Sequence, residues 1–281
     1  MRATVIFVVL AILPTISMAE DVCSYGGLPN GPLGLSFFEG DIGRPRRVCP
    51  RTELALTGGL AGIDVADDMF SDDGNFYGTL SGGGELSGSW KFSDKGEIFA
   101  SIQALHFRFV QNATITKTRM GMGWTSLGAT YLFFKNEILA LAATGRITLP
   151  TAFGYYEHAW PLTLDAGLSA ELRPLPRLSI HGQLGAITSF AIGHGDPGPR
   201  AAFQLVAGVS YRPWDWLGLV IDLGTQLGYD APLDQLTAAA GLRFHIWEGL
   251  GIELAAMLPF AGETAANMVV GLRVSYRLDG Y

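Results

Sequence analysis

The sequence predicts an all-β fold, a transmembrane antiparallel up-and-down β-barrel of about twelve strands. Three observations lead to this prediction. Apolar and polar residues alternate through about twelve segments of roughly 10 to 16 residues, close to the length of a tilted membrane-spanning strand. The connections between these segments are alternately short and long. After residue 19, no apolar run reaches the roughly 20 residues that a spanning helix needs.

The composition fits such a barrel and bounds the function. Of the 281 residues, 48% are hydrophobic and only 16% are charged, which is apolar for a soluble protein. The 37 glycines are costly in helices and common in curved sheets. The net charge of −7 argues against binding to nucleic acid.

The first 19 residues read as a secretory signal peptide. Met1-Arg2 is basic, residues 5–16 are apolar, and Ser17-Met18-Ala19 is a cleavage site of small residues. An uncleaved anchor helix is the alternative, disfavoured by the shortness of the apolar run. Export to an oxidising compartment is therefore expected.

Residues 20–50 form a separate N-terminal segment with no strand pattern, expected in the periplasm. Its two cysteines, Cys23 and Cys49, are the only two in the chain. In an oxidising compartment they are expected to form a disulfide. Two interpretations stay open: the segment caps or enters the barrel as a plug, or it is a tethered tail outside the barrel.

Residues 51–281 contain the predicted strands. The last strand is the clearest, because Met268, Val270 and Leu272 share one face while Gly271 and Arg273 share the other. The phase of the alternation changes near 104–105 and near 124–127, which indicates either bulges or wrong strand boundaries. The twelve predicted strands are roughly 52–62, 76–92, 97–110, 118–134, 138–148, 162–172, 178–190, 201–212, 217–228, 236–246, 250–259 and 268–278.

Loop lengths and aromatic residues indicate two different rims. Connections after even-numbered strands are short, such as 93–96, and those after odd-numbered strands are mostly long, such as 63–75. Aromatic residues gather where strands end, as expected at two membrane–water interfaces. The alternative is that aromatic residues are simply common in strands. The even strand count puts both ends of the barrel domain on the short-turn side.

Together these features resemble the bacterial outer-membrane β-barrel class over residues 51–281. The final amphipathic strand, from Met268 to Leu278, carries the resemblance, although the terminal aromatic residue Tyr281 is out of phase with it. The turns at Arg173-Pro174 and Arg212-Pro213, with the stretch 145–150, are faintly similar to small-molecule transporter barrels of that class. The resemblance implies an outer-membrane location, contact with lipid and lipopolysaccharide, and insertion by the barrel-assembly machinery.

If the apolar face meets lipid, the polar face lines the barrel interior. A charge facing lipid at mid-depth costs roughly 2–4 kcal/mol, so charged side chains are expected inside. Arg146 and Asp165 are predicted to pair in the outer half, and the other charged residues to gather near the periplasmic rim. They form either a constriction that selects solutes or a ladder of salt bridges that fills the barrel. The candidate lumen and selectivity residues are Arg146, Asp165, Arg243, His245, Glu253, Arg273, Arg277 and Glu53.

The sequence predicts transport rather than catalysis. None of the five histidines lies in a nucleophile motif, and no metal-binding or phosphate-binding spacing occurs, so neither cofactor nor metal is expected. The predicted function is passive diffusion of a small solute, whose identity the sequence does not give. The alternatives are a closed structural barrel that acts through its outer loops and a lipid-modifying outer-membrane enzyme.

Overall fold

The computed structural model describes residues 48–63, 78–111, 116–151, 160–192, 200–228, 232–233, 235–247, 249–261 and 266–278. The predicted signal peptide, Cys23 and Tyr281 lie outside the described residues. Among the residues that are described, no helix is long and apolar enough to cross a bilayer.

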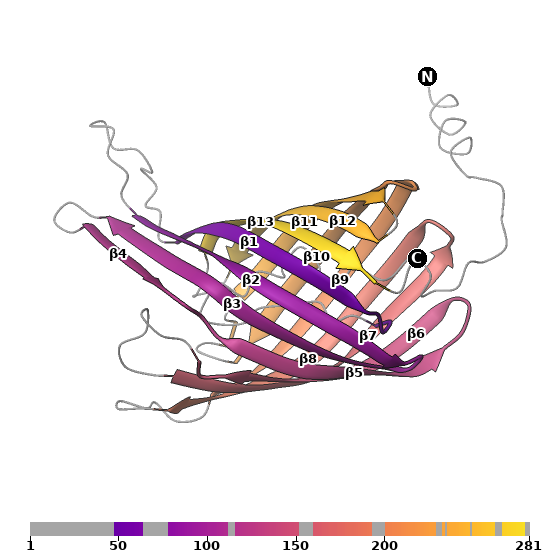
Figure 1. Ribbon diagram of the computed structural model, residues 1–281, viewed down its shortest axis with the longest axis horizontal. Helices are drawn as coiled ribbons and strands as arrows, with labels where there is room; N and C mark the ends of the chain where they lie inside the picture. Colours follow the sequence, from indigo (N-terminus) through magenta and orange to yellow (C-terminus); the bar gives the residue numbers. More distant parts are fainter. Residues whose placement is uncertain are drawn as a thin grey trace, which may run out of the picture.

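The described chain forms one closed antiparallel β-barrel, drawn from the side in Figure 1. Its strands are β1 (Glu53–Ile63), β2 (Gly78–Ser93), β3 (Gly96–Gln111), β4 (Thr116–Gly121), β5 (Thr125–Lys135), β6 (Leu139–Leu149), β7 (Trp160–Leu175), β8 (Leu178–Ile192), β9 (Arg200–Trp214), β10 (Leu217–Leu227), β11 (Gln235–Trp247), β12 (Leu250–Ala261) and β13 (Ala266–Arg277). Neighbours in sequence are neighbours in the sheet, as in an up-and-down barrel.

The barrel has twelve strands because β4 and β5 are two parts of one strand. The first half of β3 pairs with β5, and its second half pairs with β4. Closure comes from β1, which pairs with β2 on one side and β13 on the other. The predicted fold class and strand count are confirmed. Closure leaves the sheet without the two open edges that a sheet otherwise exposes.

Both predicted phase changes are real irregularities of the backbone. Gly84 pairs with Leu105 and Glu85 pairs with Gln103, which leaves Ala104 as an extra residue in β3. Ala104 and Leu105 are consequently both exposed on the outside. The break between β4 and β5 lies beside this bulge, where Gly123 N donates a hydrogen bond to Gln103 O at 2.9 Å. A Cβ on Gly123 would lie 1.6 Å from Gln103 Oε1, so this approach requires glycine.

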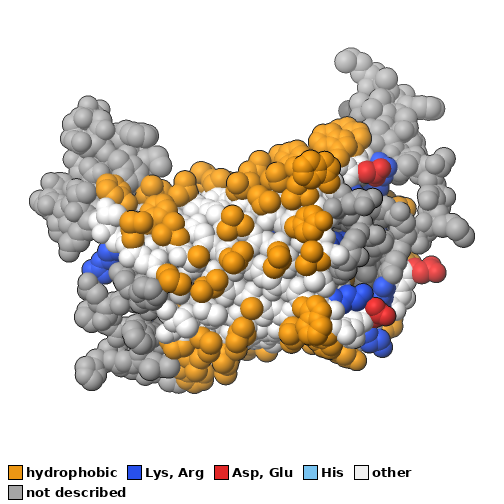
Figure 2. Space-filling view, in the orientation of Figure 1, with side chains coloured by type: hydrophobic (Ala, Val, Ile, Leu, Met, Phe, Trp, Pro, Cys, Tyr) orange, Lys and Arg blue, Asp and Glu red, His pale blue; other side chains and the backbone are white. Residues whose placement is uncertain are grey.

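The apolar face of the strands points outward. On β10, Ile221 is 63% exposed and Leu223 is 54% exposed, whereas Val220 and Asp222, which alternate with them, are buried. Of the seven largest fully buried side chains in the described residues, five are polar or charged: Gln103, Gln204, Glu171, Thr237 and Asp222. In the view of Figure 2, charged side chains gather at the two ends, and the middle of the surface shows apolar side chains between backbone and small residues. A soluble protein has the opposite arrangement, so this surface suits contact with lipid.

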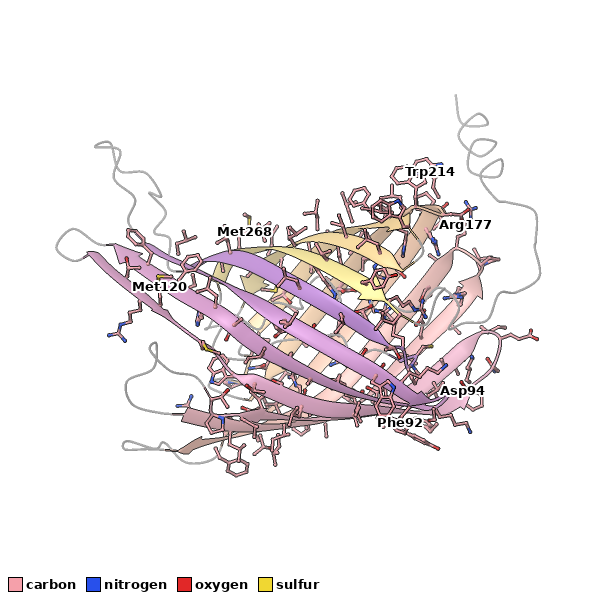
Figure 3. All side chains as sticks on the ribbon, viewed as in Figure 1. Phe92, Asp94, Met120, Arg177, Trp214 and Met268 are labelled. Carbon is pink, nitrogen blue, oxygen red and sulfur yellow. The ribbon has the colours of Figure 1, made fainter. Side chains whose placement is uncertain are left out.

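Aromatic side chains mark the short-turn end of the barrel, which lies on the right in Figures 1 and 3. Trp90, Trp214 and Trp247 are more than half exposed there. Trp214 stacks on Trp216 with ring centroids 5.7 Å apart, and Phe244 continues the stack at 6.3 Å. Large rings with polar atoms favour the interface between lipid and water. At the other end, called here the loop end, Phe203 and Phe260 are exposed in the same way.

Candidate functional site

The residues just before β1 run inside the barrel. Val48 and Cys49 are buried against Leu132 of β5 and Ala140 and Ala142 of β6, on a different part of the wall from β1. We call residues 48–52 the strap. Residues 20–47 lie outside the described chain, so whether the N-terminal segment forms a plug or a tail stays open. The Cys23–Cys49 disulfide also stays a prediction, because Cys23 is not described.

Hydrogen bonds hold the strap to the wall. The backbone N of Arg51 donates to Glu97 Oε2 at 2.9 Å, and Ser89 Oγ donates to the Arg51 carbonyl at 2.9 Å. Lys91 N donates to Thr52 Oγ1 at 3.2 Å. The strap is thereby fixed to β2 and β3 at the short-turn end.

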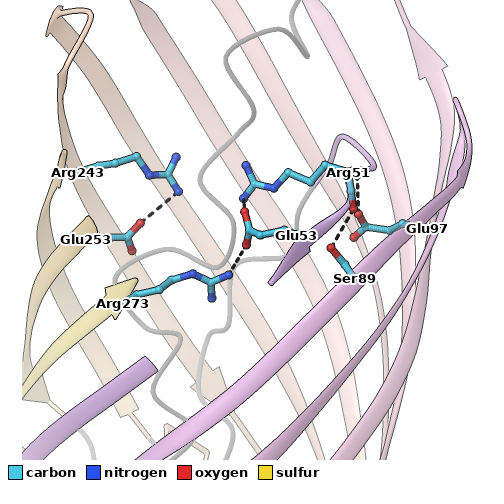
Figure 4. Close-up of polar contacts among 7 residues, drawn as sticks. All are labelled: Arg51, Glu53, Ser89, Glu97, Arg243, Glu253 and Arg273. Atoms are coloured by element: carbon cyan, nitrogen blue, oxygen red, sulfur yellow. Dashed lines mark hydrogen bonds and ion pairs between the residues drawn. The ribbon is translucent and has the colours of Figure 1, made fainter. Parts of the chain in front are cut away.

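Arg51 joins a group of charged side chains that we call the ion-pair cluster, shown in Figure 4. Glu53 accepts from Arg273 and lies 3.1 Å from Arg51 Nη2. On the neighbouring strands, Arg243 Nη2 lies 3.2 Å from Glu253 Oε2. The cluster consists of Arg51, Glu53, Glu97, Arg243, Glu253 and Arg273, all of them nine-tenths or more buried.

Strand register explains this cluster. Arg243, Glu253 and Arg273 are directly opposite one another on β11, β12 and β13. Closure then places Glu53 opposite Arg277, within reach of Arg273. The structure therefore brings together four residues of the predicted cluster. Arg277, a fifth, is opposite Glu53 in register. The four are Glu53, Arg243, Glu253 and Arg273. Sequence reasoning missed Arg51, which precedes the first strand and carries no periodic pattern.

A pocket opens into the interior beside this cluster, between β7 and β11. We call it the arginine pocket. Its lining includes His245 and the charged residues Glu171, Arg173, Arg177, Arg212 and Arg243. His245, the remaining predicted residue of the short-turn end, therefore shares this pocket with four arginines and Glu171.

Each arginine of the pocket is held by a local partner. Arg173 Nη2 lies 3.6 Å from Glu171, whose carboxylate also accepts from Ser179 Oγ at 2.8 Å. Arg177 Nη1 donates to the Pro213 carbonyl at 2.6 Å, and Arg212 Nε donates to the Asp215 carbonyl at 3.1 Å. Sequence reasoning missed Arg173 as a site residue because its predicted strand ended at residue 172. The sequence did contain the information, because Arg173 lies two residues after Glu171 and a strand places both side chains on the same face.

The middle of the interior holds a pair that sequence reasoning did not anticipate. His181 Nε2 and Asp222 Oδ1 are hydrogen-bonded across the whole width of β9. Gly208 is the residue of β9 between them in register, and a Cβ there would lie 1.9 Å from Asp222 Oδ1. Both residues lie at inward positions of the alternation on their strands. Their contact depends on a glycine on the strand that separates them.

The loop-end half of the interior is mostly neutral. Arg146 and Asp165 are opposite in register on β6 and β7, with Nη2 and Oδ2 3.0 Å apart. Around them the polar contacts are between uncharged groups: Ser126 with Thr148 at 2.8 Å, Thr163 with Ser189 at 3.2 Å, and Gln204 with Gln226 at 3.1 Å. No group of three or more metal-ligating side chains occurs within the described part of the chain.

Sequence comparisons give no relative. No family model matches the chain. No curated protein matches it either.

Solved structures match in fold. The COG4313 outer membrane channel from Pseudomonas putida F1 is 15% identical with a TM-score of 0.60, over 82% of this chain and 96% of that one. The translocator domain of the autotransporter NalP from Neisseria meningitidis is 13% identical with a TM-score of 0.52, over 82% and 88%. The KdgM porin is 10% identical with a TM-score of 0.51, over 80% and 99%.

These matches have in common a closed membrane barrel. This chain has the same closure, an apolar outer face and aromatic rims, and antiparallel barrels with these features belong to outer membranes. The chain has the fold of the bacterial outer-membrane β-barrel proteins, and the outer membrane is its location.

Proposed function

We propose that this protein is a channel for small polar solutes, and that the ion-pair cluster with the strap forms its selective constriction. One observation carries the proposal: the barrel buries charged side chains from strands far apart in sequence at one end of its interior, while lipid-facing side chains are apolar. The names of two fold neighbours, an outer membrane channel and a porin, agree with it.

The uneven distribution of charge favours a channel over a filled structural barrel. If the salt bridges served only to fill the interior, they would be expected along the whole length of the barrel. Here the strap is fixed at one end, in the same place as Arg51, Glu53 and Arg273. The loop-end half is lined by shorter neutral groups such as Ser126, Thr148 and Thr163. Charged side chains gathered at one end of a polar interior can form a selective constriction.

Ion conductance of the refolded full chain in a planar bilayer tests the proposal. Discrete and reproducible openings are expected. A folded protein that inserts and stays silent would overturn the proposal and favour a closed barrel that acts through its outer loops. Folding is checked independently by the heat-modifiable mobility of the protein on gels.

Deletion of residues 24–48 tests the role of the N-terminal segment up to and including Val48, the first residue of the strap. Removing Val48 takes away a buried contact between the strap and the β5–β6 wall, so conductance is expected to rise. The matched control is Val48→Ile, which keeps an apolar side chain at the contact and is expected to leave conductance unchanged. Equal conductance of the deletion variant and the full chain would show that the N-terminal segment does not narrow the pore.

A further inference from the structure

We propose that His181 and Asp222 form a proton-binding site in the barrel interior, and that the proton bound there changes how strongly the channel prefers anions. This inference rests on the proposed channel function and names a ligand that regulates it. His181 lies on β8 and Asp222 on β10, and their side chains meet over Gly208 of β9, with Nε2 and Oδ1 2.5 Å apart.

The pair differs from the other ion pairs of the interior in its basic partner. Glu53, Asp165 and Glu253 are each paired with an arginine, which does not lose its proton in proteins. Asp222 is paired with a histidine, the side chain whose charge ordinarily changes near neutral pH. A change of pH near neutrality therefore acts on this pair rather than on the arginines.

Asp222 depends on His181 for its counter-charge. The Asp222 side chain is fully buried, and His181 is its one ion-pair partner within the described residues. Oδ1 contacts His181, while Oδ2 has no hydrogen-bond partner in the described part of the chain. An ionised carboxylate in such a place is costly without a positive charge beside it. Protonated His181 supplies that charge.

The hydrogen bond leaves one ring nitrogen to take up the proton. An ionised carboxylate can only accept hydrogen bonds, so His181 Nε2 carries a hydrogen and donates it to Asp222 Oδ1. The neutral ring then has its lone pair on Nδ1, which becomes the second N–H group when a proton binds. The His181 side chain is 16% exposed, whereas that of Asp222 is 0% exposed. Protons consequently reach the pair through His181.

Glu171 of β7 is the other charged residue that is opposite His181 in register among the described residues, and the charge of His181 acts on it. Arg173 lies 3.6 Å from the Glu171 carboxylate, and Ser179 donates to that carboxylate at 2.8 Å. The charge of the strap residue Arg51 also acts on it. Glu171 is thus held by other groups, which leaves the His181 proton to neutralise Asp222.

The neighbours of the pair in register on β9 and β11 are neutral. Gly208 lies between the two side chains, and Ala239 follows Asp222. On the other side, Glu171 lines the arginine pocket beside the ion-pair cluster. A proton on His181 therefore adds one positive charge next to the proposed constriction, and a positive charge there favours anions over cations.

Nitrogen NMR of the folded full chain with isotope-labelled histidine tests the proton site independently of conduction. The signals of His181 are those that disappear in His181→Gln. In the wild type, Nδ1 is expected to gain a proton between about pH 8 and about pH 5, while Nε2 keeps its hydrogen throughout. Asp222→Asn is expected to release this fixed tautomer, because an amide can donate as well as accept. Signals of His181 that stay the same from about pH 8 to about pH 5 would overturn the proton site and leave the channel proposal intact.

The reversal potential in a gradient of potassium chloride tests the link to conduction. In the wild type, the chloride-to-potassium permeability ratio is expected to be at least about twofold higher at about pH 5 than at about pH 8, the effect of a unit charge roughly 8 Å away in water. The double variant His181→Gln/Asp222→Asn is expected to lose this difference. It replaces the ion pair by two amides, and Gln204 and Gln226 show that the interior accommodates such a contact.

The matched control is the double variant Arg146→Gln/Asp165→Asn, which neutralises a buried ion pair that contains no histidine. It is expected to keep the wild-type pH difference, and heat-modifiable mobility on gels shows that each variant is folded. An equal pH difference in His181→Gln/Asp222→Asn and the wild type would overturn the link between the proton site and conduction. A protein that stays silent in bilayers at both pH values while its His181 ring still takes up a proton would overturn the channel proposal and support the proton site.

Discussion

The two halves of the barrel interior differ in how their charges are connected. At the loop end, the buried charges of the described residues are those of one pair, Arg146 and Asp165, and the nearby Ser126 and Thr148 are neutral. At the short-turn end, Glu53 contacts two arginines, Arg51 and Arg273, and the latter is opposite Glu253 in register. A pair can be replaced as a unit, but a cluster cannot be opened at one point without leaving other buried charges uncompensated. The short-turn end is therefore where substitution of one charged residue is expected to disturb the most others.

The largest expected effect is the loss of Arg273. Arg273→Met leaves the buried Glu53 with one arginine fewer, and we expect the free energy of unfolding to fall by roughly 3–5 kcal/mol. Urea titration of the barrel folded in lipid vesicles measures it. Adding Glu53→Leu is expected to restore little, because it also removes the ion pair between Glu53 and Arg51. A double variant with the wild-type free energy of unfolding would show that the cluster consists of independent ion pairs.

A smaller effect is expected from the pair at the loop end. Arg146→Met removes the guanidinium group 3.0 Å from the buried Asp165 carboxylate, which is expected to cost about 3 kcal/mol by the same measurement. The double variant Arg146→Met/Asp165→Leu is expected to recover to within about 1 kcal/mol of the wild type, because a buried ion pair and apolar side chains of similar volume are close in stability. Failure to recover would mean that the pair is part of a wider network, and the contrast between the halves would disappear.

The smallest expected effect concerns the neutral lining. Thr148→Val removes a hydroxyl group that lies 2.8 Å from Ser126 Oγ, and it keeps the side-chain shape. We expect a loss of about 1 kcal/mol, typical of one buried hydrogen bond between uncharged groups. Adding Ser126→Ala is expected to change stability little further. A loss as large as that of Arg146→Met would show that the neutral contacts matter as much as the ion pair.

Much of the fold could be predicted because strand periodicity is local. A period of two assigns each side chain to a face without reference to any other strand, and Asp165 and Arg273, which it assigns to the inward face, are buried. The bulge at Ala104 was visible for the same reason, as two outward residues in succession. The pairing of Arg146 with Asp165 followed from one hairpin, where distance from the shared loop approximates the register.

The rest of the site could not be predicted, because it depends on contacts across several strands. Arg51 lies outside every periodic segment, yet its chain runs inside the barrel and its backbone N contacts Glu97. Arg212 and Arg177 meet the same 213–215 turn only because β8 and β9 align their ends. No pattern along one strand contains this information.

The sequence by itself determined the two-faced strands, their number and the rim on which each turn lies, since these depend on neighbours along the chain. The tertiary structure alone decided which inward charges meet. Arg273 and Glu53 are 220 residues apart and touch because the barrel closes, and His181 reaches Asp222 because Gly208 leaves the path between them open. Register and closure set these distances, and both are properties of the whole sheet rather than of any one strand.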